Sequence, residues 1–324
     1  MTTSHFPAGC FGKLPQFGDF VKHNASSGEM LAFDQWLQQG MQFAQRHFNQ
    51  SWDQAYQQAP AYHFLFYADR PARLLLGLLQ PSCDKSMRKY PFWISLTVEK
   101  TKLSEAVVSA LPAAFSTFFA QARQLLHNVR NELERRDLGG RIEKLKVEFP
   151  GALDAEAREH QSQLTAMTSE HLWRGLFDRF DDRRKYLLFK NLTEILLPYR
   201  GRDAAKLMLG LRFPLMADAA RREHEVNFWL QATQQLLRDP DFLPLLFWSA
   251  PEGKKRPYLF LFFRPPAVKN FVQLVQPDLP SDIICELEEE GRDKIDSARS
   301  ALLAPFHALL ETPAMTLRTV LMRL

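Results

Sequence analysis

Residues 9–20 have the sequence Gly-Cys-Phe-Gly-Lys-Leu-Pro-Gln-Phe-Gly-Asp-Phe. Three glycines, a proline and an aspartate among aromatic side chains are too many special backbone positions for a continuous helix or strand. We predict a short apolar strand over Cys10–Leu14, followed by a rigid turn made by Pro15 and Gly18. The Asp19 carboxylate can then accept hydrogen bonds from nearby backbone N–H groups, and the Phe20 ring can fold back onto the core.

Several short apolar or aromatic runs beyond this segment predict further strands. They lie at 62–67, 73–79, 91–98, 206–213, 243–248 and 257–263. Polar turns at 68–72 and 251–255 separate two of the pairs, which is typical of hairpins. The run Leu259–Phe263 is apolar without alternation, which indicates a strand covered on both faces.

Apolar side chains spaced by three and four residues predict helices between these strands. The expected helices span 29–58, 104–137, 223–237 and 268–275, together with most of the last thirty residues. Ser104 is the expected N-cap of the second helix, Pro112 a kink or break within it, and Gly139-Gly140 its end. His224 and Glu225 lie at a charged helix end and are expected to be solvated.

Strands grouped between long helices and joined by short turns predict an α+β fold. We expect a mostly antiparallel sheet flanked by long helices, α/β/α sandwich-like, with a helical middle and C-terminal region. Residues 1–140 are the predicted N-terminal α+β domain. Residues 141–324 are a helical segment followed by a second strand-pair and helix subdomain, either separate or packed with the first as one unit. A helix followed by two strands occurs twice, through duplication or as a common way to cover a sheet.

Composition excludes several functional classes. The 324 residues carry 41 basic and 37 acidic side chains, a net charge of +4 that is too small for a general nucleic-acid binder. The three cysteines have neither metal-ligand nor disulfide spacing, which fits a reducing compartment. We find no basic-then-apolar leader and no apolar run of about 18 residues. We therefore expect a cytoplasmic protein without membrane insertion.

A search for catalytic patterns finds little. Gly9, Gly12 and Lys13 resemble a phosphate loop, but the spacing is wrong and Leu14-Pro15 replaces the helix start that such loops need. The histidines show no metal-binding pairing, and no Gly-x-Ser-x-Gly elbow occurs. The aspartates at 178–182 alternate with arginines, which at helical spacing predicts i,i+3 and i,i+4 ion pairs on the surface. We expect no cofactor and no metal.

Four segments together carry a family resemblance. Residues 12–20 match Gly-Lys-Leu-Pro-x-x-Gly-Asp-Phe, and Phe33-Asp34-Gln35-Trp36-Leu37 and Trp52-Asp53-Gln54-Ala55-Tyr56 follow in order. Residues 81–92 match Pro-Ser-x-Asp-x-x-Gly-Arg-x-Tyr-Pro-Phe, with Met87 in place of the glycine. The chain resembles the TagF (ImpM) family, accessory proteins of the bacterial type VI secretion system, over residues 9–98.

The resemblance implies a cytoplasmic, non-catalytic protein that represses type VI secretion post-translationally by engaging the forkhead-associated (Fha) scaffold protein. The motif and candidate partner-binding residues are Gly12, Lys13, Pro15, Gly18, Asp19, Phe20, Asp84, Arg88, Tyr90, Pro91 and Phe92. Glycines and prolines would shape turns, and Tyr90 and Phe92 would fix the block to the sheet.

The sequence leaves three alternatives open, two that concern polar residues and one that concerns an apolar stripe. An Asp84–Arg88 pair could pin a loop through a charge-assisted hydrogen bond, or be exposed to a partner. A different class of function is a hydrolase acting on a phosphorylated or acyl substrate through Lys13, Asp19, Asp84 and Arg88. The apolar stripe Leu317, Val320, Leu321 and Leu324 could pack within the molecule or contact a membrane-anchored machine.

Overall fold

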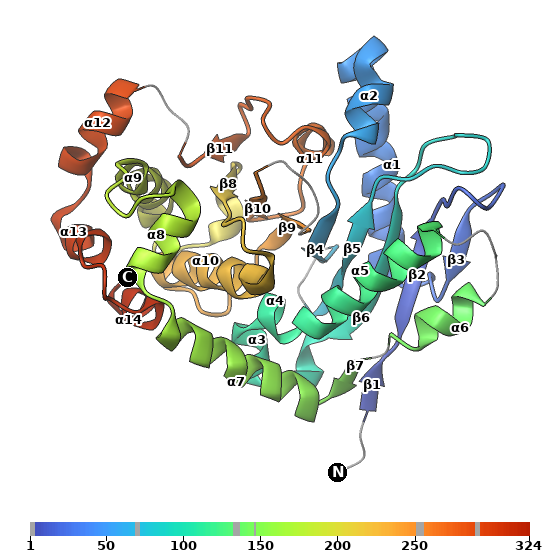
Figure 1. The fold of residues 1–324 in the computed structure, drawn as a ribbon, viewed down its shortest axis with the longest axis horizontal. Helices are drawn as coiled ribbons and strands as arrows, with labels where there is room; N and C mark the ends of the chain where they lie inside the picture. Colours follow the sequence, from blue (N-terminus) through green and yellow to red (C-terminus); the bar gives the residue numbers. More distant parts are fainter. Residues whose placement is uncertain (1–3, 69–71, 132–136, 146, 251–255, 289–291) are drawn as a thin grey trace.

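A computed structural model describes residues 4–68, 72–131, 137–145, 147–250, 256–288 and 292–324. One nine-stranded sheet runs through the molecule in the order β11-β8-β10-β9-β4-β5-β6-β2-β3 (Figure 1). The centres of both predicted hairpin turns and part of the predicted 104–137 helix lie outside the described residues. The predicted strand pairs themselves are confirmed.

The sheet is mostly antiparallel, as predicted, with β8 and β11 as its parallel pair. Its strands are β2 (Ala8–Gly12), β3 (Val21–His23), β4 (Tyr62–Phe66), β5 (Arg73–Gln80), β6 (Phe92–Glu99), β8 (Gly210–Pro214), β9 (Leu245–Ser249), β10 (Tyr258–Phe262) and β11 (Ile284–Glu286). Strands β1 (Ser4–Phe6) and β7 (Val147–Phe149) form a separate pair. Every residue of β10 is buried, so the prediction of a strand covered on both faces is confirmed.

Helices cover both faces of the sheet, which confirms the α/β/α arrangement. Successive side chains of a strand point to opposite faces. On one face the Phe64 ring of β4 stacks on Phe33 of α1 (Gly28–Phe48), with ring centroids 4.5 Å apart. On the other face the neighbouring His63 stacks on Phe119 of α5 (Ser116–Asn131) at 4.6 Å.

The two halves of the chain share this sheet through one strand pair. Strand β4 pairs with β9 in antiparallel register, with Tyr62 opposite Ser249 and Leu65 opposite Leu246. The Phe64 and Phe247 rings are stacked across the pair, 6.2 Å apart. Strands from before and after residue 140 therefore belong to one continuous sheet. The division of the chain into two domains near residue 140 remains a prediction.

The other helices lie around this sandwich (Figure 1). They are α2 (Trp52–Gln57), α3 (Glu105–Ser109), α4 (Leu111–Ala114), α6 (Leu138–Glu143), α7 (Gly151–Ala166), α8 (Ser169–Phe177), α9 (Arg184–Leu196), α10 (Arg222–Leu237), α11 (Phe271–Val275), α12 (Arg292–Ala301), α13 (Ala304–Glu311) and α14 (Leu317–Arg323). Leu317, Val320 and Leu321 of α14 are buried, and α14 packs on α7 and α10, so this stripe is an internal packing face. None of the helices described is both long and apolar enough to span a bilayer.

Two helix boundaries and one strand boundary differ from the predictions. Gly139-Gly140 do not end a helix: Asp137 is the N-cap of α6, and its carboxylate accepts the Gly140 N–H at 3.0 Å. A 3₁₀ turn at Asn49–Ser51 divides the predicted 29–58 helix into α1 and α2. The predicted strand at 206–213 starts only at Gly210, because Ala204–Lys206 forms another 3₁₀ turn.

The predicted solvation of Glu225 is wrong, whereas His224 is half-buried. Glu225 is 1% exposed, and both of its carboxylate oxygens accept the backbone N–H of Met216, at 3.0 and 3.1 Å. Burial raises the pKa of Glu225 to about 7. Two residues earlier, the Glu223 carboxylate lies 2.9 Å from the imidazole Nδ1 of the buried His63. The first turn of α10 therefore lies against the sheet, although its charged sequence indicates a solvated helix end.

The buried imidazole of His160 on α7 predicts a pH-dependent stability. Its Nε2 accepts from Asn227 at 2.8 Å, and its Nδ1 lies 3.3 Å from Nδ1 of His224. Burial and the nearby His224 lower the pKa of His160 from 6.5 to about 4. The unfolded chain therefore binds more protons between these values, so the stability supplied by neutral His160 is present above pH 6.5 and lost as the pH falls through 4.

When the pH is lowered from 7.5 to 4.5, we expect the free energy of unfolding of His160→Gln to rise by about 2–3 kcal/mol relative to that of the wild type. Urea unfolding of both proteins at the two pH values measures this change. Glu225 acts with the opposite sign, because its raised pKa weakens the fold as the pH rises from 4.5 to 7. That contribution is common to both proteins and cancels. An unchanged difference between the two proteins would contradict a neutral, buried His160.

Candidate functional site

The site is centred on the buried carboxylate of Asp84, in the loop between β5 and β6. Its side chain is 0% exposed. Oδ1 accepts the backbone N–H groups of Ser86 and Arg88, at 2.9 and 3.0 Å. Oδ2 accepts from the Arg88 Nε at 2.6 Å and lies 3.0 Å from the Lys13 Nζ. Four donor groups therefore converge on one carboxylate.

These contacts join the loop at 81–91 to the segment at 13–20. Arg88 Nη2 donates to the Gly18 carbonyl at 2.7 Å, and the Lys85 N–H donates to the Phe17 carbonyl at 2.8 Å. Lys13, which is 7% exposed, reaches Asp84 from the end of β2. The Asp84–Arg88 pair thus pins the two loops together, with the Lys13 ammonium as a second cation inside the cluster.

The hydrogen bonds decide the ionisation of Asp84. Burial by itself would raise the pKa of the carboxyl group. Hydrogen bonds from the Arg88 backbone and from the Lys13 and Arg88 side chains outweigh burial, and they lower the pKa from 3.8 to about 2. The stability that this carboxylate contributes is therefore present above pH 3.8 and lost as the pH falls towards 2.

Gly12 is the glycine that the geometry requires. Its φ is +131°, and a Cβ placed on it would lie 2.1 Å from the Pro91 carbonyl oxygen. Gly18 has an ordinary φ and open space around it, so its predicted role in setting the turn is wrong. The turn after Pro15 is closed instead by the Phe17 N–H, which donates to the Leu14 carbonyl at 3.0 Å.

Asp19 and Phe20 lie at the rim of the cluster. The Asp19 carboxylate accepts the Phe20 N–H at 2.8 Å, which confirms the expected local hydrogen bond. The Phe20 ring contacts the rings of Phe11 and Tyr90 at 5.2 and 5.0 Å but stays 40% exposed. The Lys13 Nζ lies 5.1 Å from the centre of the Phe20 ring, within cation–π range.

The loop at 81–91 also binds the two motif segments on α1 and α2. Of the residues that make these contacts, Tyr90 is a predicted site residue, and Lys89, Asp34 and Asp53 are not. The Tyr90 hydroxyl donates to the Asp34 carboxylate of α1, and burial and this carboxylate raise the Tyr90 pKa. Lys89 pairs with Asp53 of α2 at 2.5 Å. All four segments that carry the resemblance therefore meet at this loop, and Phe92, at the start of β6, is buried beneath it. Asp34 and Asp53 could have been predicted as site residues, because they lie in two of the motif segments.

Met87 keeps the backbone conformation of the glycine that it replaces. Its φ is +63°, in the left-handed region, and its side chain is 65% exposed. The Met87 N–H donates to the Asp84 carbonyl at 2.9 Å and closes the turn. A residue with a Cβ pays a conformational penalty in this region.

We expect Met87→Gly to raise the free energy of unfolding by roughly 0.5–1 kcal/mol, because glycine removes the penalty but adds entropy to the unfolded chain. Met87→Ala is the matched control: it also loses the long side chain, yet it keeps the Cβ and should not gain. Chemical denaturation of the three proteins measures the difference. An equal gain for both variants would place the effect in the side chain.

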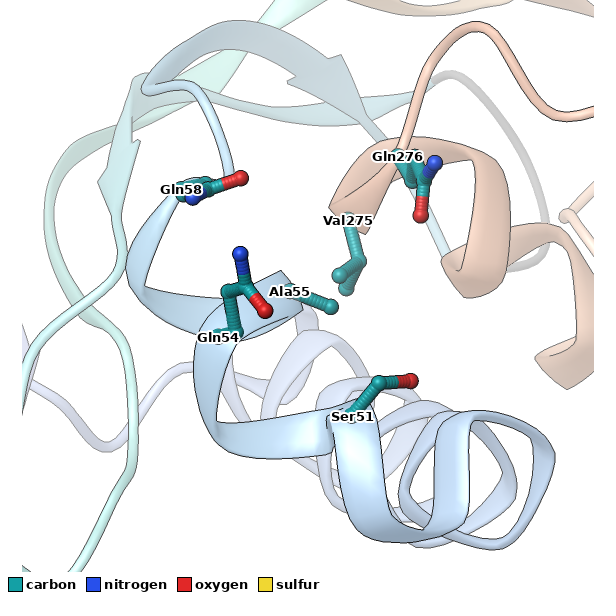
Figure 2. Close-up of a pocket in the computed structure, with 6 residues that line it drawn as sticks. All are labelled: Ser51, Gln54, Ala55, Gln58, Val275 and Gln276. Carbon is teal, nitrogen blue, oxygen red and sulfur yellow. The ribbon is translucent and has the colours of Figure 1, made fainter.

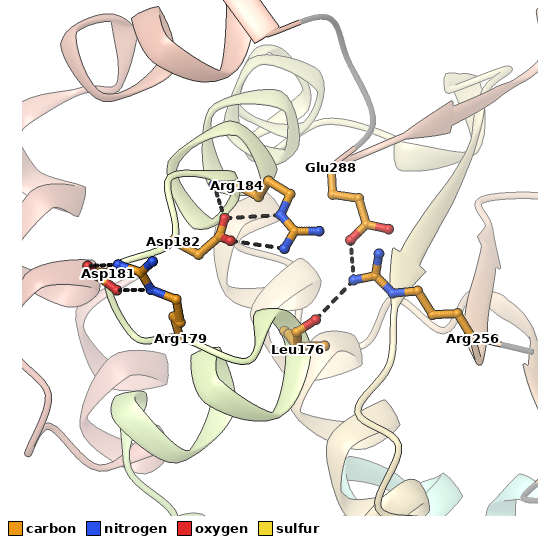
Figure 3. Close-up of polar contacts among 7 residues, drawn as sticks. All are labelled: Leu176, Arg179, Asp181, Asp182, Arg184, Arg256 and Glu288. Atoms are coloured by element: carbon orange, nitrogen blue, oxygen red, sulfur yellow. Dashed lines mark hydrogen bonds and ion pairs between the residues drawn. The ribbon is translucent and has the colours of Figure 1, made fainter.

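The acidic segment after α8 is not helical, so the predicted i,i+3 and i,i+4 ion pairs are wrong. Helix α8 ends at Phe177, because Asp178 takes a left-handed φ of 65° as its C-cap. The pairs form instead between residues two apart: Arg179 binds Asp181, and Arg184 binds Asp182, each through two N–H groups (Figure 3). The expectation that arginines neutralise the aspartates is confirmed for Asp181 and Asp182.

A neighbouring arginine caps the same helix. Arg256 donates to the Leu176 carbonyl at 3.1 Å and to the Glu288 carboxylate at 3.0 Å (Figure 3). Within the described ranges, no three His, Cys, Asp or Glu side chains are grouped so that they could hold a metal ion. The polar residues of this region therefore serve to end helix α8.

Comparison with known proteins gives a family for part of the chain. Residues 9–145 match the model described as "TagF N-terminal domain, Type VI secretion system-associated". A search of curated proteins finds no match. Among solved structures, PA0076 from Pseudomonas aeruginosa PAO1 is 24% identical with a TM-score of 0.35, over 42% of this chain and 60% of that one. Residues 9–145, which contain the Asp84 cluster and all four motif segments, are thus a TagF N-terminal domain, associated with type VI secretion.

Proposed function

We propose that the protein is a non-catalytic regulator that acts in the cytoplasm by binding the Fha scaffold protein, and so represses type VI secretion after translation. The observation that carries this proposal is the saturation of Asp84: its carboxylate is buried and accepts from four donor groups. Such a group positions loops and has no lone pair directed at a substrate. What the cluster offers to solvent is a fixed surface.

We define the signature surface as the exposed groups that this cluster holds: the Phe20 ring, the Met87 side chain and the Arg88 guanidinium. Phe20 is 40% exposed, Met87 65%, and the Arg88 side chain 60%. Aromatic, methionine and arginine side chains are enriched at protein interfaces. A rigid backbone beneath them lowers the entropic cost of binding.

Repression would follow from mass action. A regulator that binds the scaffold removes it from assembly in proportion to the concentration of free regulator over its dissociation constant. Deletion of the gene should therefore increase secretion through the type VI apparatus. Complementation with the wild-type gene should restore repression, and complementation with the Arg88→Ala gene should not. Unchanged secretion and unchanged scaffold assembly after deletion would contradict the proposal.

The hydrolase alternative needs Lys13, Asp19, Asp84 and Arg88 to act on one substrate. We favour binding because the described partner of the Asp19 carboxylate is a backbone N–H at the rim, while the other three side chains bind one another. Assays of the purified protein for phosphatase, nucleotidase and esterase turnover separate the two functions. Turnover lost in both Asp19→Ala and Asp84→Ala, with folding retained, would support the hydrolase.

A further inference from the structure

Three adjoining hollows follow α2, beside the signature surface. The first, about 150 Å³, is lined by residues that include Tyr56, Ser82 and Met87. A small central hollow of about 20 Å³ shares Tyr56 and Pro81 with it. The third, about 240 Å³, shares Val275 with the centre. We call the three together the α2 groove.

The third hollow is lined mainly by uncharged hydrogen-bonding groups. The side chains of Gln54 on α2 and Gln276 after α11 point toward the same space, with Ala55 and Val275 between them (Figure 2). Primary amides both donate and accept hydrogen bonds, as a peptide backbone requires of its partner. The chemistry of this end of the groove is therefore that of a peptide site.

Two residues with buried hydroxyl groups line the rest of the groove. Ser82 is 8% exposed and lines the first hollow, and Tyr62 is 2% exposed and lines the centre. Neither the Ser82 Oγ nor the Tyr62 Oη has a hydrogen-bond partner among the described residues. A buried hydroxyl without a partner is costly. The central hollow has room for one water molecule, which can bridge the Tyr62 hydroxyl and a bound carbonyl group by hydrogen bonds.

The charge of the groove limits its occupant. Of the described residues that line it, Lys89 alone is charged, and Asp53 neutralises it at 2.5 Å. An acidic or phosphorylated ligand would find no unpaired cation in this lining, and a charged side chain would be desolvated without compensation. Each hollow is also smaller than a typical small-molecule pocket. The shape and polarity fit an extended chain whose side chains enter successive hollows.

We propose that the α2 groove binds an uncharged, extended peptide segment of a partner protein, with an aliphatic side chain in the hollow beside Ser82. Its backbone would bind the glutamine amides and the Ser82 hydroxyl. The inference rests on the proposed function, since it names a binding surface for a protein that acts by binding. The proposed peptide site is a neutral groove beside the signature surface, which carries the charge of Arg88.

The test uses the full-length protein and a displayed library of random twelve-residue peptides. Selected peptides are synthesised, and their affinities are measured by fluorescence polarisation. We expect uncharged sequences rich in aliphatic residues, with Ala55→Arg weakening binding at least ~10-fold by placing bulk and charge in the third hollow. Ser82→Ala should weaken binding about 2- to 10-fold, the range for one hydrogen bond. Ala301→Arg, on the distant helix α12, is the matched control and should bind normally.

A second variant protects the test against misfolding. If Ala55→Arg does not fold, Gln276→Arg introduces the same charge from the other wall of the groove. The inference is overturned if no peptide is selected, if the selected peptides are acidic, or if they bind the groove variants as tightly as the wild type. The library contains no scaffold protein, so its result is independent of whether Fha is the partner.

Discussion

Replacing Asp84 with alanine lowers the midpoint of thermal unfolding by roughly 5–10 °C, the effect expected when one member of a buried ion pair is removed. The substitution leaves the Lys13 ammonium buried without its counter-charge. It also removes the acceptor of the Ser86 and Arg88 N–H groups, so the loop at 81–91 loses its internal hydrogen bonds. Differential scanning calorimetry of both proteins at pH 7 measures the shift.

Three further variants separate charge from hydrogen bonding. Asp84→Asn keeps an acceptor oxygen, so its midpoint of thermal unfolding should fall less than that of Asp84→Ala. Lys13→Met combined with Asp84→Ala removes the stranded charge and should be less destabilised than the two single changes add up to. Asp19→Asn, on the exposed carboxylate of the same segment, should unfold at the wild-type temperature. A midpoint for Asp84→Ala within a degree of the wild type would contradict the role assigned to this carboxylate.

We expect residues 1–145 expressed alone to form oligomers or precipitate, although they contain the whole region that matches the TagF model. Strand β4 would lose its partner β9 and become a sheet edge. All five of its residues are buried in the intact chain, so the exposed edge would be both apolar and unpaired. Such edges pair with other copies of the chain. Size-exclusion chromatography with light scattering reports the oligomeric state.

Co-expression provides the matched control for this truncation. Residues 146–324 supplied as a separate chain contain β9 and should restore a soluble one-to-one complex. A monomeric 1–145 fragment that unfolds cooperatively would instead show that the first part of the chain is an independent domain. That outcome would support the division near residue 140 that the sequence suggests.

Local patterns were sufficient to predict much of the fold. Apolar runs bounded by turn residues predicted the β4–β5 and β9–β10 hairpins, because strand pairing across a short turn is encoded locally. The N-cap at Ser104 followed the same logic, and its hydroxyl accepts the Val107 N–H at 3.3 Å. The motif at 81–92 correctly placed Asp84 next to Arg88.

Contacts between distant segments could not be predicted in this way. Lys13 and Asp84 lie 71 positions apart, and nothing in their own neighbourhoods indicates that both are buried. The first turn of α10 is rich in charge, which favours a surface position, yet Glu225 is buried and accepts the Met216 N–H from the segment after β8. Met87 shows a related limit: the backbone keeps a left-handed turn that its residue type disfavours.

Isothermal titration of the full-length protein with purified Fha scaffold shows whether the buried cluster holds a surface for this partner protein. We expect one binding event for the wild type and a loss of at least ~10-fold in affinity for Arg88→Ala, a change of about 1.4 kcal/mol or more. Ala301→Arg, on the distant helix α12, should bind as the wild type does. Absence of binding by the wild-type protein, or equal affinity of Arg88→Ala and wild type, would contradict the claim.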